Sequence, residues 1–156
     1  MIYRRENQNC LKYFHLSAQY TKVEINGYFF EGGANLNQKD NIRLIKKTIR
    51  KIIDSQHKNI KVRYIKIGAS KYQEVGLPDL QILIYNVTDK KHLKFWIEIK
   101  RNWNDKPSKL QIFNIIDLRC YGYRTGFIAG DEFKESILQN AEKIEDYFRY
   151  WIIDGF

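Results

Sequence analysis

Cysteine and histidine are scarce in this chain of 156 residues, and long apolar runs are missing. The two cysteines, Cys10 and Cys120, are too few for a disulfide framework or a zinc site. The histidines are scattered, so we expect no histidine-based catalytic centre. No apolar run approaches a membrane span, and the first residues lack the apolar segment of a signal peptide. We therefore expect an intracellular, cytoplasmic protein with no membrane partner.

Acidic residues are in the minority, which indicates a nucleic-acid partner. The chain has 27 Lys+Arg against 18 Asp+Glu, a net charge of +9 and a pI near 9.5. Such charge is attracted to backbone phosphates without reading sequence. Many basic proteins bind no DNA, so the distribution is more informative than the total. Basic residues stand on both sides of residues 79–98, at Lys46, Lys47, Arg50, Lys51, Lys58, Lys61, Arg63, Lys66, Lys71, Lys100, Arg101, Lys106 and Lys109.

The most informative pattern present is Gly76-Leu77-Pro78-Asp79 followed by Glu98-Ile99-Lys100. Residues 93–100 alternate apolar and polar, which is typical of a strand with Glu98 and Lys100 on one face. Asp79 opens a second apolar run, residues 80–85, behind a proline that suits a strand start. If these two strands are neighbours, Asp79 and Glu98 converge.

Two converging carboxylates provide the oxygen ligands that magnesium prefers. A metal there would activate water and neutralise charge on an attacked phosphate, and Lys100 could orient the water or hold the phosphate. The alternative is that Asp79 is a turn residue and that Glu98 and Lys100 are a solvated pair.

Periodicity elsewhere predicts a single domain with the element order αβββαβα. Besides the two strands above, we expect a helix over 41–54, a strand over 61–67, a helix over 108–121, a strand over 125–129 and a long amphipathic helix over 131–153. The helix over 108–121 should turn Leu110, Phe113, Ile116 and Leu118 inward and end at Gly122. We expect residues 1–36 to form an N-terminal extension packed on the 37–156 domain, with a hairpin near 20–31 around Asn26-Gly27. Its aromatic residues, Tyr28 to Phe30, could cover the core, stack on bases or form a dimer contact.

In order and spacing, residues 38–133 resemble the PD-(D/E)xK nuclease superfamily and look most like its VRR-NUC branch. The resemblance implies an α/β, restriction-endonuclease-like αβββαβ core, here with a C-terminal helix and the N-terminal hairpin extension. It also implies that Asp79, Glu98 and the carbonyl of Ile99 bind Mg²⁺, for which Mn²⁺ can substitute. Lys100 would assist the water, and Gln111 would lie beside the site.

The chain also departs from the family pattern. Members usually carry a Glu near the start of the first helix, where Asp40 is the only acid here. Asp40 either replaces it or is a first-turn acid facing the helix dipole. Similarly, Ser108-Lys109-Leu110-Gln111 fits a capping box, which would explain Gln111 with or without a role in the site.

A second resemblance, to Holliday-junction resolvases of the same superfamily, comes from Arg63 and Gly68-Ala69-Ser70. It implies that Ser70 approaches the scissile phosphate, although Ser70 could equally be an ordinary loop residue. The expected nucleic-acid contacts are Arg63, Lys66, Ser70, Lys71 and Arg101. Resolvase-like members pair two active sites, so we expect a homodimer, with the hairpin or the apolar residues 147–153 as its contact.

Three classes of function follow from these patterns. The first is a magnesium-dependent DNA endonuclease that selects branched, flap or single-stranded DNA. The second is a catalytically weak or inactive nuclease-fold protein that binds nucleic acid. In the third, a structural or interaction protein, the motif is accidental.

Overall fold

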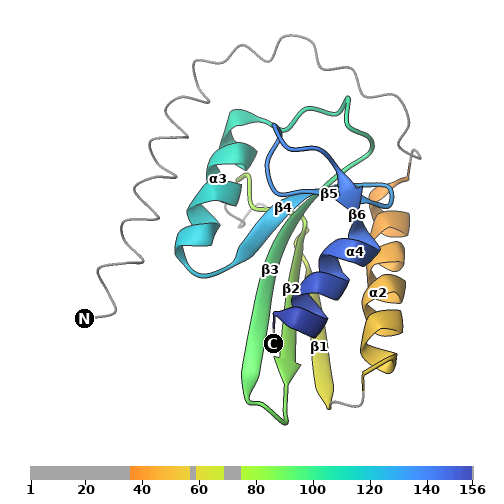
Figure 1. Ribbon diagram of the computed structural model, residues 1–156. Coiled ribbons are helices and arrows are strands. Elements are labelled where there is room, and N and C mark those ends of the chain that lie inside the picture. The colour runs from red at the N-terminus through yellow and green to blue at the C-terminus, as the bar shows by residue number, and fades with distance from the viewer. Residues whose placement is uncertain (1–35, 57–58, 69–74, 156) are drawn as a thin grey trace.

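The computed structural model describes residues 36–56, 59–68 and 75–155 and has a mixed α/β fold on a six-stranded, mostly antiparallel sheet (Figure 1). Its elements are α2 (Gln38–Asp54), β1 (Ile60–Lys66), β2 (Leu80–Asn86), β3 (Lys91–Lys100), α3 (Lys109–Cys120), β4 (Arg124–Ala129), β5 (Glu132–Lys134), β6 (Glu142–Lys143), α4 (Ile144–Arg149) and a π-helical turn (Tyr150–Asp154). The strands lie in chain order, and the only parallel neighbours within these ranges are β3 and β4, which α3 connects. The predicted order of helix, three strands, helix and strand is confirmed. The predicted N-terminal hairpin lies outside the described residues.

Strands β1, β2 and β3 form an antiparallel meander, as the alternation of apolar residues predicted. The β2–β3 turn is fixed by Asn86, whose buried side-chain oxygen accepts hydrogen bonds from the Thr88 and Asp89 amides at 3.1 and 3.2 Å. A side chain that binds its own following backbone amides is a frequent turn former. This turn sets the register that pairs Leu80 with Ile97 at the far end of the hairpin.

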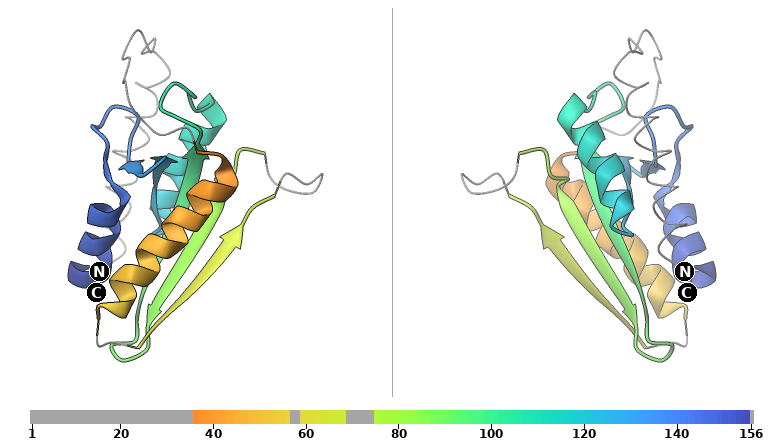
Figure 2. Two further views of the ribbon diagram at one scale, coloured as in Figure 1. Left: turned by 90° about the vertical axis from the view of Figure 1, so that its right-hand side faces the viewer. Right: turned by 90° about the vertical axis from the view of Figure 1, so that its left-hand side faces the viewer.

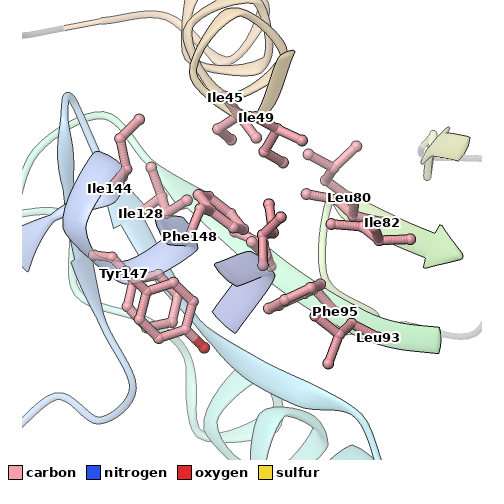
Figure 3. Close-up of a cluster of buried hydrophobic side chains, with 14 of the residues drawn as sticks. Ile45, Ile49, Leu80, Ile82, Leu93, Phe95, Ile128, Ile144, Tyr147 and Phe148 are labelled. Atoms are coloured by element: carbon pink, nitrogen blue, oxygen red, sulfur yellow. The ribbon is translucent and has the colours of Figure 1, made fainter. Parts of the chain in front are cut away.

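Helices α2 and α4 cover one face of the sheet and enclose the main apolar core (Figure 3). Ile45 and Ile49 of α2 are fully buried and point toward Leu80 and Ile82 of β2. From α4, Phe148 packs edge-on against Phe95 of β3 with ring centroids 5.5 Å apart. Each such side chain contributes about 1.5–3 kcal/mol by leaving water, so this face provides most of the stability of the fold.

Helix α3 lies on the opposite face of the sheet and covers only one end of it (Figure 2, right). The predicted inward set is wrong in part: Leu110 and Phe113 are 43% and 44% exposed, and the buried residues are Asn114 and Ile115. The helix is turned so that Gln111 and Ile115, four residues apart, face the sheet, because Gln111 contacts strand β3. A polar contact therefore fixed a rotation that apolar periodicity could not predict.

The predicted long helix over 131–153 is also wrong. Gly130 turns the chain with a φ of 59°, and residues 132–134 and 142–143 add strands β5 and β6 to the sheet. Phe133, which fits the helical spacing, is instead paired with Ile128 on β4. Its ring stacks on that of Tyr147 with the ring centroids 3.6 Å apart. Helix begins only at Ile144, so the pairing of residues distant in sequence overrode the local pattern.

Candidate active site

Asp79 and Glu98 lie opposite each other at the ends of two neighbouring strands. The β2–β3 ladder ends with the pair of Leu80 and Ile97, so the next position places Asp79 across from Glu98. The Asp79 carboxylate accepts a hydrogen bond from the amide of Ile99 at 2.8 Å, which ties it to β3. The predicted convergence of these two acids is therefore present in the structure.

Gly76 explains why the chain can deliver Asp79 to this point. Its φ of 84° is in the region that favours glycine, and a Cβ there would lie 2.6 Å from the Leu110 side chain of α3. Asn114 of α3 also donates to the carbonyl of Val75 at 3.4 Å. The segment before Pro78 thus passes closely under α3 before Asp79 enters the site.

Glu98, Lys100 and Gln111 form a buried polar network on the same face. Glu98 is 3% and Lys100 6% exposed, and their charged groups are 3.2 Å apart. The Gln111 amide joins them: its nitrogen donates to Glu98, and its oxygen accepts from Lys100 at 2.9 Å. The same oxygen accepts from the Ser108 amide at 2.9 Å, so the capping box and the site contact are both present. The co-facial placement of Glu98 and Lys100 is confirmed, whereas the solvated pair is not what the structure has.

Burial raises the pKa of both carboxyl groups. For Glu98, burial and then the negative charge of Asp79 raise the pKa to about 7, against the opposing effect of Lys100. For Asp79, burial raises the pKa, while the Ile99 amide, Lys100 and Gln38 oppose the rise. Two like charges facing each other in a poorly hydrated site are unfavourable. The arrangement would be relieved by a proton or by a cation placed between the two carboxylates.

Gln38 is the site residue that the sequence patterns did not predict. Its amide nitrogen donates to the other oxygen of Asp79 at 2.7 Å from the first turn of α2. Asp40 instead lies at the surface, where its carboxylate accepts from Asn37 at 2.7 Å and pairs with Arg43 at 3.3 Å. The first-turn interpretation of Asp40 therefore fits the structure. Gln38 stands two positions before Asp40, so the sequence could have suggested it as an alternative site residue. Only the packing of α2 decides which of the two side chains reaches Asp79.

The five residues expected to contact nucleic acid do not all lie on the face that carries Asp79 and Glu98. Arg63 is exposed and lies on the face of the sheet that carries Asp79 and Glu98, because it pairs with Leu83 on β2. Lys66 pairs with Leu80 on the opposite face, yet its charge still lowers the pKa of Asp79. Arg101 is exposed directly after Lys100. Ser70 and Lys71 lie outside the described residues.

The site offers few carboxylate ligands, yet they are enough for Mg²⁺. Among the described residues, no group of three or more His, Cys, Asp or Glu side chains is gathered for a metal. Magnesium, however, keeps several waters and commonly takes only one or two carboxylates plus substrate phosphate. Asp79 and Glu98, which repel each other, fit that smaller requirement.

Comparisons with models of protein families, with curated proteins and with solved structures each find no match. Within the described ranges, no helix is both long and apolar enough to cross a membrane.

Proposed function

We propose that this chain is a magnesium-dependent endonuclease of the PD-(D/E)xK type, with a restriction-endonuclease-like core made by α2, β1, β2, β3, α3 and β4. The observation that carries the proposal is the position of Asp79 across from Glu98, with the Lys100 ammonium 3.2 Å from Glu98. Two carboxylates that can bind a cation, together with an adjacent lysine, are the groups that hydrolysis of a phosphodiester needs.

Each side chain has a distinct part in this proposal. Asp79, Glu98 and the Ile99 carbonyl would hold the cation, which when bound lowers the pKa of a coordinated water and neutralises charge on the phosphate. Lys100 donates hydrogen bonds to the attacking water or to a phosphate oxygen. Gln111 holds Lys100 and Glu98 in place through its amide, and Gln38 does the same for Asp79.

A second function is supported by Gln38. Gln38 brings an amide to Asp79 where an acid would supply a further anionic ligand, so the described part of the site offers the cation Asp79 and Glu98 without a third carboxylate from α2. Affinity for a hard cation depends on ligand charge, so the chain could bind nucleic acid through this fold while cleaving it slowly.

The proposed homodimer finds less support in residues 147–153 than their sequence suggested. Phe148 and Ile152 are buried within this chain, and Tyr150, at 57%, is the large exposed side chain of this segment. Pairing of two copies therefore stays a proposal, to be measured by light scattering at micromolar concentration.

Cleavage of a DNA panel tests the proposed function. Duplex, single-stranded, flap and four-way-junction substrates are incubated with Mg²⁺, Mn²⁺ or EDTA. We expect products with either metal and none with EDTA, faster on the branched or single-stranded substrates than on plain duplex. The variant Asp40→Asn is the matched control for Asp79→Asn: both lose one acid, but only Asp79 lies in the site, so only Asp79→Asn should stop cleavage. Binding without cleavage under all metal conditions would favour the second function, and neither binding nor cleavage would overturn both.

A further inference from the structure

The face of the sheet that carries the acid pair continues beyond α3 on β1, β2 and β3 as a surface that none of the described helices covers, and we call it the open surface. Register places Arg63, Leu83 and Lys94 in one row across these strands, and Lys61, Tyr85 and His92 in the next row. Lys61, Arg63 and His92 are exposed, and Tyr85 is 40% exposed. In Figure 2 (right), α3 covers only the upper end of this face and α2 lies behind the sheet.

This surface carries one sign of charge. A third row, Ile65, Gln81 and Trp96, lies between these two rows and the acid pair. The nine positions of the three rows hold Lys61, Arg63 and Lys94 and no Asp or Glu. Along these strands, the first acids on the same face are Asp79 and Glu98 themselves, in the row that follows Ile65, Gln81 and Trp96. A basic surface that leads directly to the candidate acids favours a polyanion that must reach them.

Aromatic side chains accompany these charges. The register places Tyr85, which is 40% exposed, between Lys61 and His92. Tyr123, after α3, lies beside the buried Trp96 with ring centroids 6.1 Å apart, its ring is 4.8 Å from the Lys94 ammonium, and its hydroxyl accepts from Gln81 at 3.2 Å. An exposed ring such as Tyr85 is a platform on which a base stacks, and stacking with backbone charge is how sheets bind single strands.

We propose that this open surface binds a single strand of nucleic acid and guides it along β1 and β2 to Asp79 and Glu98. The proposal rests on the proposed function, because it names the path by which substrate reaches that site. Neighbouring strands are 4.7–4.9 Å apart, so β1 to β3 spans about 10 Å, which fits one strand better than a duplex. Arg63, Lys61 and Lys94 bind phosphates, and Tyr85 stacks on a base.

Equilibrium binding tests the proposal without cleavage. The full chain is titrated in EDTA against a fluorescent single-stranded oligonucleotide and a duplex of equal length, with anisotropy read at several salt concentrations. The test variants are Arg63→Glu and Tyr85→Ala. Lys91→Glu is the matched control for the first, since Lys91 is exposed on β3 with the same change of charge but pairs with Asn86 on the opposite face. Thermal melts establish that each variant folds.

We expect tighter binding of the single strand than of the duplex. Arg63→Glu should weaken it about tenfold and reduce the slope of log K against log salt by about 0.7, the value per neutralised phosphate of a single strand. Tyr85→Ala should weaken it about fivefold or more through lost stacking, and Lys91→Glu should change it far less. Equal effects of Arg63→Glu and Lys91→Glu, or preference for the duplex, would overturn the inference.

The outcomes separate this inference from the proposed function. Metal-dependent cleavage that needs Asp79, together with unchanged binding in Arg63→Glu and Tyr85→Ala, leaves a nuclease that uses another surface. Single-strand binding that falls in both variants, together with no cleavage under any metal condition, supports the surface and removes the nuclease.

Discussion

The two faces of the sheet differ in what their buried side chains do. On the face covered by α2 and α4, residues such as Ile49, Leu80 and Phe95 are fully buried and apolar, and the buried side chains of this face carry no charge. On the other face, Glu98 and Lys100 are nearly as buried, at 3% and 6% exposed, yet they carry charge. Burial of apolar groups stabilises the fold, whereas burial of charge costs free energy unless it is paired.

This difference indicates that stability and chemistry are divided between the faces of one strand. Alternate residues of β3 point to opposite sides, so Ile97 enters the core while its neighbour Glu98 enters the candidate site. The core face can therefore hold the strand rigid while the other face keeps its unfavourable acid pair. Substitutions on the two faces should accordingly have different consequences.

The largest effect is expected at the acid pair. Asp79→Asn and Glu98→Gln should each lower the rate of cleavage about a thousandfold or more. Each removes one negatively charged ligand of the cation, and the cation is what neutralises the charge on the reacting phosphate. Thermal unfolding of Asp79→Asn should occur near the wild-type temperature, because removing the repulsion between the carboxylates offsets the loss of one of the two hydrogen bonds that Asp79 accepts from Ile99 and Gln38. Full activity in either variant would overturn the assignment of the site.

On the core face the expected effect is on folding. Phe148→Ala removes a fully buried ring that packs on Phe95 and should cost about 3–5 kcal/mol of the free energy of unfolding. Urea denaturation measures the loss. Tyr150→Ala, in the adjacent π-helical turn, removes an exposed ring and serves as the control, with a much smaller cost. Equal costs at the two positions would contradict the packing described for α4.

The raised pKa of Glu98 predicts how stability varies with pH in EDTA. Below pH 4.5 the carboxyl group is protonated in both states. Between pH 4.5 and about 7 the unfolded chain releases this proton while the folded chain keeps it, so stability falls as pH rises, by up to about 3 kcal/mol. Urea denaturation at several pH values measures this, and Glu98→Gln should remove the fall. Mg²⁺ should restore stability above pH 7, where Glu98 is ionised. An identical pH profile for Glu98→Gln would contradict the pKa shift.

A gain of metal affinity is expected from Gln38→Glu. The new carboxylate would replace the amide that donates to Asp79 and add a third negative charge to the site. We expect binding of Mn²⁺, followed by calorimetry, to tighten on the order of tenfold, because affinity for hard cations rises with ligand charge. The metal-free variant should melt at a lower temperature than the wild type. Asp40→Glu, which keeps its charge away from the site, should bind the metal as the wild type does.

The smallest effects concern the cap of α3. Ser108→Ala should cost about 1 kcal/mol of stability by removing the side-chain cap, with little change in cleavage. Gln111→Ala loses a similar amount and also loses the contacts to Glu98 and Lys100, so its rate should fall, although less than in the acid variants. Thermal melts and initial rates distinguish the two. If both variants cleave equally well, Gln111 is a cap and nothing more.

Local pattern was sufficient for much of the fold. Alternation in residues 93–100 predicted a strand with Glu98 and Lys100 on one face, and the spacing of Ile45 and Ile49 predicted α2. Ser108 and Gln111 predicted the start of α3. These features depend on side-chain direction within one element, so the sequence nearby contains the information.

In residues 131–143 the local pattern predicted a helix where the structure has strands, and the reason is physical. Phe133 fits a helical repeat, but pairing with Ile128 of β4 and stacking on Tyr147 outweigh local preference. Such contacts join residues that are distant in sequence, and no window of neighbouring residues contains them.

By itself, the sequence determined the two acids, the adjacent lysine and the strands on which they lie, because period-two alternation and the turn before β3 are local. Tertiary structure alone decided that Gln38 rather than Asp40 reaches Asp79, that α3 turns Gln111 toward Glu98, and that the described helices leave a basic surface on β1 to β3 uncovered beside them. The rotation of a helix against a sheet depends on the side chains of both partners, and these meet only when the chain has folded.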